Sequence, residues 1–227
     1  MNKCANCQQL LAKNANYCGN CGQSSKELRQ PFWQFLRDSL HELLDIDGRL
    51  MLTLRTLLFK PGFASFEFAQ GKKVKYTPPL RLYLVVSLLF FLILGSFNNL
   101  LPDGELRSQS ATETYSRIMF VLFPVFAIYV GVFFRQSYFL ANLVFSMHLH
   151  TIAYLALLVI GSLESMEQRS PLFVFLQVFP AAYFLWYVLA AFKTMFQESF
   201  LSTILKSGAI YFVYMATLGL VFDVILG

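Results

Sequence analysis

The stretch YFLANLVFSMHLHTIAYLALLVIGSL, residues 138–163, decides the fold of this chain. Its 26 residues include no Asp, Glu, Lys or Arg. About 20 apolar residues are enough for a helix to cross the hydrocarbon core of a bilayer. A helix of this length extends roughly 39 Å, so we predict a transmembrane helix that tilts or protrudes from the membrane.

Four more apolar segments of similar character share the C-terminal part of the chain: residues 80–97, 118–134, 172–192 and 207–225. Together with 138–163 they predict a transmembrane domain over residues 80–227. The chain is 56% apolar and only 14% charged, whereas a typical globular protein is about a quarter charged. We therefore expect an all-α polytopic membrane protein with about five transmembrane helices. Because a polar region precedes the first span, we expect that span, not a cleavable signal peptide, to direct insertion.

Positive charge is concentrated ahead of the first span. Residues 1–79 hold 11 Lys/Arg against 6 Asp/Glu, whereas residues 80–227 hold 7 of each. Most acidic residues of the second part lie in 98–117 and 164–171. The basic residues of the other connections fall on the side of the N-terminus: Arg135, Lys193 and Lys206. The positive-inside rule then predicts a cytoplasmic N-terminus and an external C-terminus. Residues 194–206 are expected to form a cytoplasmic interfacial piece or else to extend the last helix.

All four cysteines lie near the N-terminus in two CxxC pairs separated by ten residues: Cys4, Cys7, Cys18 and Cys21. Two CxxC turns place four thiolates around one tetrahedral ion, with metal–sulfur bonds of about 2.3 Å. Gly22 after the second pair permits the positive φ that turns a backbone N–H toward sulfur, whereas Gln8 takes that place in the first pair. We predict a small zinc ribbon over residues 1–25 that holds one structural zinc ion.

Two other uses of these cysteines remain open at this point. Disulfides form in an oxidising compartment, which a cytoplasmic N-terminus disfavours. A redox CxxC is expected at the start of a helix in a βαβ unit, and no such pattern surrounds the cysteines. A closed four-sulfur site has no open coordination position, so the ion is expected to fold the ribbon and not to catalyse.

Residues 26–79 are predicted to form basic amphipathic helices at the membrane surface. Apolar residues recur at helical spacing in 31–48 and 49–60, and a shorter piece covers 63–70. All three are too short or too polar to cross a bilayer. They are expected either to lie in the membrane interface or to dock on the cytoplasmic ends of the spans.

Two polar groups in this segment are candidate sites. The first is an interfacial group on one predicted helix: His41, Asp45 and Asp47. His41 and Asp45 are four residues apart, so they share a helix face and could bind a metal or relay a proton, although a solvated polar face is the simpler interpretation. The second group directly precedes the first span: Lys72, Lys73 and Lys75. These lysines could hold anionic headgroups or a phosphate, each contributing on the order of 1 kcal/mol, or could simply anchor the span.

An ordered series of motifs resembles an uncharacterised bacterial family of zinc-ribbon multi-span membrane proteins. The series begins with the CxxC pairs and continues toward the first span: Asp45-Ile46-Asp47-Gly48, Thr53-Leu54-Arg55, Pro61-Gly62, Gly71-Lys72-Lys73, Tyr76 and Pro78. The resemblance covers roughly residues 4–90, and Lys73 stands where the family often has arginine. It implies zinc and a location in the bacterial inner membrane, and it implies no activity.

Polar residues within a predicted span are candidates for function, and the third span has nearly all of them. Asn142, Ser146 and His150 advance four residues at a time and form one stripe. His148 lies on another side, because two residues rotate a helix by about 200°, so the two histidines cannot chelate one ion. We expect the stripe to face the bundle interior, opposite Gln177 on the fourth span. The alternative is a set of hydrogen bonds that only holds the helices together.

Three classes of function fit this pattern. The first is a non-catalytic scaffold or regulator whose zinc ribbon and basic helices bind a cytoplasmic protein partner or anionic membrane lipids. The second is a transporter or channel for a small solute, ion or lipid, formed as a homo-oligomer and using the polar stripe. The third is an interfacial enzyme that uses the group around His41. We favour the first, and scattered basic residues make a nucleic-acid partner the weaker expectation.

Overall fold

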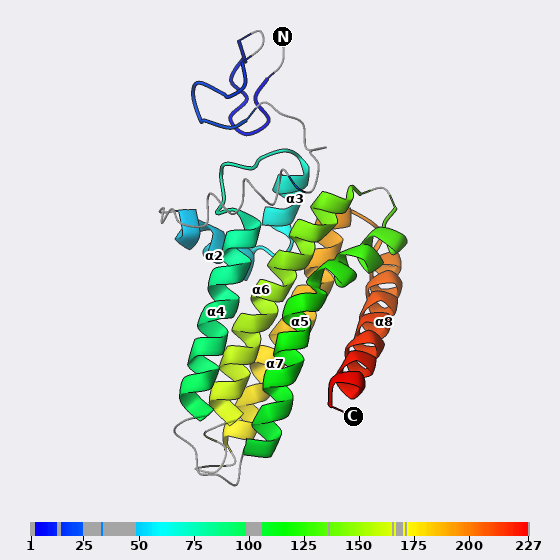
Figure 1. Cartoon of the computed structure of the whole chain (residues 1–227). Helices are drawn as coiled ribbons and strands as arrows, with labels where there is room; N and C mark the ends of the chain where they lie inside the picture. Colours follow the sequence, from blue (N-terminus) through cyan, green and yellow to red (C-terminus); the bar gives the residue numbers. More distant parts are fainter. Residues whose placement is uncertain are drawn as a thin grey trace.

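The computed structural model describes residues 3–12, 15–24, 33, 49–98, 106–135, 137–164, 166, 170 and 172–226. Within these residues the chain forms seven helices and no strand, apart from two isolated β-bridges near the N-terminus. Five long helices form a bundle, two short helices lie across one end of it, and the cysteine-containing segment stands beyond them (Figure 1).

The bundle helices succeed one another in antiparallel order: α4 (Pro79–Asn98), α5 (Leu106–Phe133), α6 (Phe139–Glu164), α7 (Leu172–Phe196) and α8 (Phe200–Leu226). Each contains one of the predicted apolar segments. α5 begins twelve residues before its apolar segment and α8 seven residues before. Residues 200–206 therefore extend the last helix, as the second alternative for 194–206 expects, whereas residues 194–196 end α7 and 197–199 connect the two helices.

Three of these helices are long and apolar enough to cross a membrane: Phe139–Glu164, Leu172–Phe196 and Phe200–Val224. Among the described residues, α4 and α5 contribute shorter apolar stretches, Pro79–Ile93 and Ile118–Phe133. The chain is thus consistent with a membrane protein.

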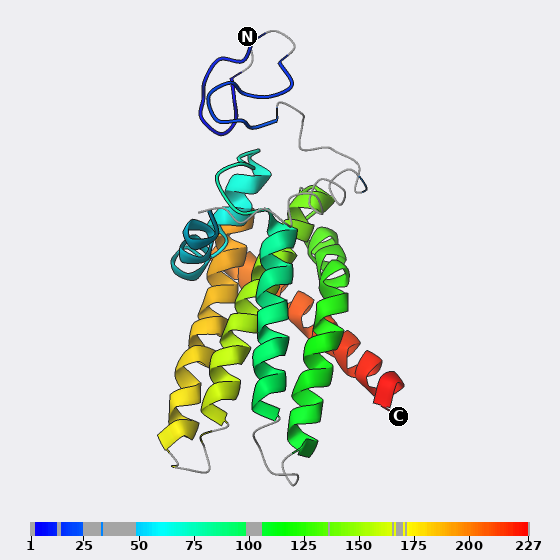
Figure 2. The same cartoon turned by 60° about the vertical axis from the view of Figure 1, so that its left-hand side comes forward.

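α6 lies at the centre of the bundle, with α4, α5 and α7 around it (Figures 1 and 2). Every residue from 140 to 152 is buried. This explains why the predicted span richest in polar residues is also the one in the middle, because a polar side chain costs least where it faces protein and not lipid.

Two short helices, α2 (Arg49–Phe59) and α3 (Phe63–Ala69), form at the positions that the sequence predicts. Leu57 and Ala64 are fully buried, and α3 contacts both α6 and α7. These two helices therefore dock on the ends of the bundle helices. We refer to α2, α3 and the following loop 70–78 as the collar.

Gly62 sets the angle between the two collar helices. Its φ is 74°, a left-handed conformation that glycine adopts without strain. A Cβ on Gly62 would lie 2.4 Å from the carbonyl oxygen of Ala191 in α7. Only a residue without a side chain allows the turn to approach α7 this closely.

Pro124 lies inside α5 and has no N–H to donate to the carbonyl of Phe120. The Tyr83 hydroxyl of α4 donates a hydrogen bond to this carbonyl at 2.9 Å. The rings of Tyr83 and Phe120 also stack with centroids 5.4 Å apart. The proline thus exposes a backbone acceptor that joins α5 to α4.

Candidate functional site

Each CxxC pair forms the same local structure, and the second copy follows the first by 14 residues. In the first, the N–H of Cys4 donates to the carbonyl of Gln9 at 2.8 Å, and in the second Cys18 donates to Gln23 at 2.7 Å. The antiparallel bridges Lys3 to Leu10 and Tyr17 to Ser24 flank them at the same offset. Both CxxC segments therefore fold as equivalent knuckles.

The second half of each knuckle turns through a residue with positive φ, 61° at Gln8 and 70° at Gly22. Both N–H groups donate back to the first cysteine of their pair, Gln8 to Cys4 at 2.9 Å and Gly22 to Cys18 at 2.8 Å. The left-handed turn predicted for Gly22 is confirmed. Gln8 adopts the same conformation, although it lacks the freedom of glycine.

The four cysteine Sγ atoms lie within 4.8 Å of one another. Across the two knuckles, the Sγ atoms of Cys4 and Cys21 are 3.6 Å apart and those of Cys7 and Cys18 are 3.5 Å apart. A disulfide has its sulfurs about 2.0 Å apart, and all four cysteines are free. Four sulfurs around a tetrahedral ion with 2.3 Å bonds are separated by roughly 3.8 Å, so the donor set and its spacing fit one tetrahedral metal ion.

The first knuckle also favours the thiolate form that a metal requires. A hydrogen bond from the backbone of Gln9 is the main cause that lowers the pKa of the Cys7 thiol to about 6, with smaller contributions from Asn20 and the neighbouring cysteines.

Gln23 connects the second knuckle to the collar. Its side-chain Nε2 donates to the carbonyl of Gly71, and its Oε1 accepts from the N–H of Lys73 at 3.1 Å. Gln23 is buried, whereas Gln9, its equivalent in the first knuckle, is exposed. The same position is therefore used for docking in one knuckle and faces outward in the other.

A buried carboxylate organises the collar itself. Glu67 of α3 is 4% exposed, and its oxygens accept from Lys72 at 2.8 Å and from Lys75 at 2.7 Å. The Tyr76 hydroxyl donates to the same carboxylate. One acidic side chain thus holds the loop that leads into α4.

The cluster around Glu67 shifts the pKa values of its members. Burial alone would raise the pKa of the Glu67 carboxyl, but the hydrogen bonds from Lys72, Lys75 and Tyr76 outweigh it and lower the pKa to about 2. The hydrogen bond to Glu67 raises the pKa of Lys75. Burial, aided by the same carboxylate, raises the pKa of Tyr76. Glu67 and Lys75 therefore stay charged, and Tyr76 stays neutral, over the whole physiological pH range.

The loop 70–78 is fixed from α2 as well. Thr53 accepts a hydrogen bond from the N–H of Thr77 at 2.9 Å while its hydroxyl donates to the carbonyl of Arg49 at 2.8 Å. The Arg49 guanidinium donates to the carbonyl of Val74 at 3.1 Å. Several motif residues named above, Thr53 and Tyr76 among them, therefore meet around this loop.

The three lysines predicted to contact lipid or phosphate also have partners within the protein. Lys72 and Lys75 share the single negative charge of Glu67, which balances half of their joint positive charge, and Lys73 contributes its backbone N–H to the docking of Gln23. Glu67 and Gln23 supply the side chains that these lysines contact. The sequence analysis selected neither of them. The signal available was an isolated Glu in the apolar segment FASFEFA, followed closely by three lysines.

The polar stripe on α6 faces the interior and is hydrogen-bonded there. The Ser146 hydroxyl donates to the carbonyl of Phe123 in α5 at 2.6 Å. His150 Nδ1 lies 2.8 Å from the carbonyl of Ser146, which can only accept, so Nδ1 carries the proton. Its Nε2 then accepts from the Tyr214 hydroxyl of α8 at 2.8 Å.

The other members of the predicted intramembrane site have separate surroundings. Asn142 accepts from Ser137 at 2.7 Å through its Oδ1. His148 Nδ1 lies 2.8 Å from the Ser65 hydroxyl of α3, so the two histidines face different helices, as their spacing predicts. Gln177 is half-buried on α7, and among the described residues its Nε2 has no hydrogen-bond partner. His41, Asp45 and Asp47 lie outside the described residues.

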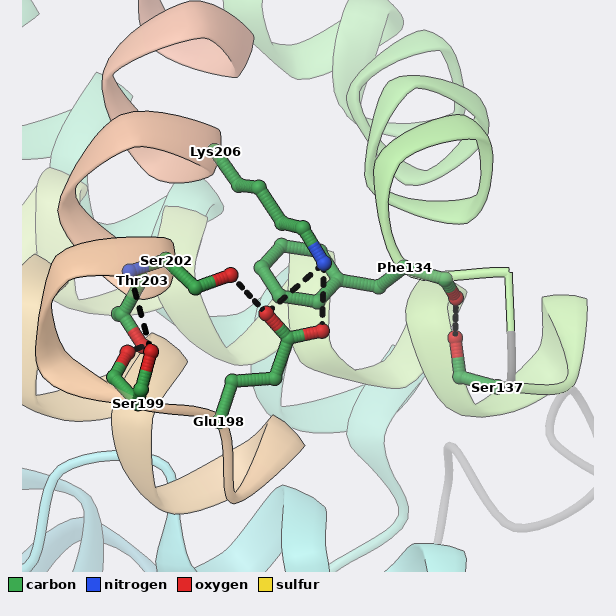
Figure 3. Close-up of polar contacts among 7 residues, drawn as sticks. All are labelled: Phe134, Ser137, Glu198, Ser199, Ser202, Thr203 and Lys206. Atoms are coloured by element: carbon green, nitrogen blue, oxygen red, sulfur yellow. Dashed lines mark hydrogen bonds and ion pairs between the residues drawn. The ribbon is translucent and has the colours of Figure 1, made fainter.

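A second ionic contact stabilises the turn between α7 and α8, shown in Figure 3. The Lys206 ammonium lies 2.6 Å from Glu198 and 4.9 Å from the ring centroid of Phe134, which directly follows α5. Ser199 accepts from the N–H of Ser202 at 3.4 Å and begins α8 as its N-cap. The turn therefore joins three helices at the same end of the bundle as the collar.

Residues 47–91 match a family described as "Protein of unknown function (DUF3667)". No curated protein and no solved structure matches the chain. The matched segment contains the collar and most of α4, and it begins after the cysteine knuckles. The expected resemblance to an uncharacterised family is confirmed for that segment, while the knuckles lie outside it.

Proposed function

We propose that this protein is a non-catalytic scaffold or regulator of the bacterial inner membrane. Its zinc ribbon and its collar form one cytoplasmic surface that binds a protein partner or anionic lipid. The observation that carries the proposal is the contact between Gln23 and the loop 70–78, because it joins the metal-binding module to the helices that dock on the bundle.

Zinc is the metal that fits the four-cysteine cluster best. Four thiolates at tetrahedral spacing are typical of structural zinc, and a site with four protein ligands has no position for a substrate. The backbone N–H of Cys18 donates a hydrogen bond to the carbonyl of Gln23. Zinc bound at Cys18 and Cys21 therefore holds the residue that docks the ribbon.

A transmembrane domain of five spans is part of this proposal. α4 has 20 residues and α5 has 28, or roughly 30 and 42 Å of helix. Both run alongside α6 (Figure 1). With five spans and a cytoplasmic N-terminus, the C-terminus lies outside. This orientation agrees with the positions of Arg135, Lys193 and Lys206 on the collar side.

The outer face of α2 is the part of the collar best suited to lipid. Met51 and Phe59 are exposed apolar residues, Arg55 is an exposed basic residue of the same helix, and the exposed Lys60 directly follows it. A helix that combines exposed apolar and basic side chains binds at the interface of an anionic membrane. This face is a better candidate for lipid contact than Lys72 and Lys75, which are paired with Glu67.

The polar stripe gives the transport alternative little support. Ser146 and His150 use their hydrogen bonds to join α6 to α5 and α8. Such bonds between helices hold a bundle together. A proton or solute flux through reconstituted vesicles that disappears in His150→Ala would favour transport over the scaffold.

Crosslinking in native membranes followed by mass spectrometry tests the proposal. The wild-type protein should contain one zinc ion per chain and give crosslinks from the ribbon or collar to one recurrent partner. Cys18→Ser should lose both the zinc and the crosslinks, and Gln23→Ala should keep the zinc but lose most crosslinks. Partner crosslinks that persist in Cys18→Ser would contradict the proposal.

A further inference from the structure

A cleft of about 460 Å³ opens between α5, α6, α7 and α8, at a distance from the collar. Its wall includes the small side chains Ala153 and Ala156 of α6 and Ala181 of α7. α7 and α8 meet at the turn 197–199 and diverge away from it (Figures 1 and 2). Small residues and diverging helices together leave this space unfilled.

Three aromatic rings close the end of the cleft that is nearer the collar. Phe126 lies edge-on to His150 with centroids 5.4 Å apart, and edge-on to Tyr214 with centroids 5.0 Å apart. His150 and Tyr214 are joined by the hydrogen bond at 2.8 Å. This three-ring plug is buried, and both nitrogens of its histidine are already bonded within the protein. The plug therefore presents a closed, uncharged surface to the cleft.

The depth of the cleft corresponds to one leaflet of a bilayer. The plug lies at His150, about 11 residues or roughly 16 Å along α6 from its start at Phe139. The α6 lining ends at Ile160, roughly 15 Å further on. Half of a 30 Å hydrocarbon core is also about 15 Å. The cleft thus runs from the middle of the membrane toward the face opposite the collar.

The cleft is open to the lipid phase at its side. Met215 of α8 is 50% exposed, and Ala181 of α7 is exposed as well. Most other lining side chains are apolar, and none of the described residues that line the cleft is charged. A molecule can therefore enter from the leaflet without crossing the protein, and it gains by placing hydrocarbon, not a polar group, against the plug.

We propose that this cleft binds one acyl chain of a phospholipid from the leaflet opposite the collar, with the chain end against the plug of Phe126, His150 and Tyr214. The glycerol and headgroup then remain at the far surface, where they are hydrated. The acyl chain is favoured over a ligand with a polar end group, because the plug lies at mid-membrane and both nitrogens of its histidine are already hydrogen-bonded within the protein. This site is independent of the ribbon and the collar.

Photocrosslinking of the full-length protein tests this site. The protein is reconstituted into phosphatidylglycerol and phosphatidylethanolamine vesicles that contain a phospholipid with a diazirine at the end of one acyl chain. The expected adducts fall on peptides that cover residues 149–160 and 211–218. Ala156→Phe fills the cleft and should reduce these adducts roughly tenfold, which corresponds to about 1.4 kcal/mol.

Matched variants separate specific binding from the general lipid surface. Ala216→Phe adds the same ring at an exposed position of α8 and should leave the adducts unchanged. Ala156→Leu, a smaller change, should give an intermediate yield and carries the test if Ala156→Phe does not fold. Equal yields in Ala156→Leu, Ala156→Phe and wild type would overturn the proposal. So would labelling by a polyisoprenoid probe with the same diazirine when the acyl probe gives none.

Discussion

The collar and the buried half of α6 both place polar side chains among apolar ones, but the two regions differ in the kind of partner that these side chains bond to. In the collar, the Glu67 carboxylate meets two ammonium groups and a phenol. The buried half of α6 has no carboxylate or ammonium group, and its hydrogen bonds run either to a neighbouring helix, such as Ser146 to Phe123 and His150 to Tyr214, or within α6, such as Thr151 to Met147.

The difference follows from the surroundings. The collar lies at one end of the bundle, where Lys72 and Lys75 keep part of their side chains exposed and can remain hydrated. The middle of α6 has no such access, and a charge there would be costly. Ionic contacts therefore fix the end of the bundle, and weaker neutral hydrogen bonds fix its interior. Four variants or conditions test this contrast.

Removing the charge of Glu67 should have the largest effect. Glu67→Gln leaves two partly exposed lysines beside an uncharged amide, and a hydrogen bond to a charged group contributes about 1.5–3 kcal/mol. We expect a loss of this size in the free energy of unfolding in detergent. Glu198→Gln is the matched control, since Glu198 and Lys206 are both about 30% exposed and should contribute at most about 1 kcal/mol. Equal losses in the two variants would remove the special role of Glu67.

Acid should weaken the collar in the same way without a mutation. The pKa of Glu67 falls from 4.5 to about 2 in the folded chain. Its stabilisation is therefore complete above about pH 4.5 and is lost as the pH falls toward 2. Between pH 7 and 5 the stabilisation by Glu67 is constant, so Glu67 should cause no change in the unfolding temperature over this range. The loss of unfolding temperature at acid pH should disappear in Glu67→Gln. The same dependence of unfolding temperature on pH in the variant and the wild type would contradict this role of Glu67.

Closing the space at Gly62 should have an intermediate effect. Gly62→Ala places a Cβ against the backbone of Ala191 and forces a left-handed conformation on alanine. Overpacking of this kind costs about 1–3 kcal/mol. Gly161→Ala is the control, because nothing lies within 4 Å of its added Cβ and the helix should gain slightly. A neutral Gly62→Ala would show that α3 does not dock as closely on α7 as described.

Removing a neutral hydrogen bond from α6 should have the smallest effect. Ser146→Ala loses the bond to Phe123, and bonds of this type between membrane helices average about 0.6 kcal/mol. Ser162→Ala removes a bond within α6, to Leu158, and should change the unfolding free energy less. If Ser146→Ala cost as much as Glu67→Gln, the contrast between the collar and the interior would fail.

Much of this architecture could be predicted from periodicity. The apolar segments locate all five long helices, and the spacing of leucines locates α2. The polar content of 138–163 indicates its place at the centre. The ends of the helices were harder to predict. The first turns of α8 are stabilised by hydrogen bonds to Ser199 and Glu198, and hydropathy does not detect such local contacts.

The candidate site was only partly predictable. The CxxC spacing predicts the cysteine cluster, since its ligands are close in sequence. The docking of Gln23 joins residues about 50 positions apart. The exposed bond acceptor created by Pro124 also depends on a second helix. Contacts of this kind arise from packing, and no local pattern of residues encodes them.

The docking of the ribbon on the collar through Gln23 is most directly tested by hydrogen exchange at the Lys73 amide, which donates to Gln23. In the zinc-loaded protein this amide should exchange slowly. Removal of zinc with a chelator should accelerate it to the rate found in Gln23→Ala, while amides in α6 keep their protection. An unchanged Lys73 amide after zinc removal, or equal protection in Gln23→Ala and wild type, would contradict the account.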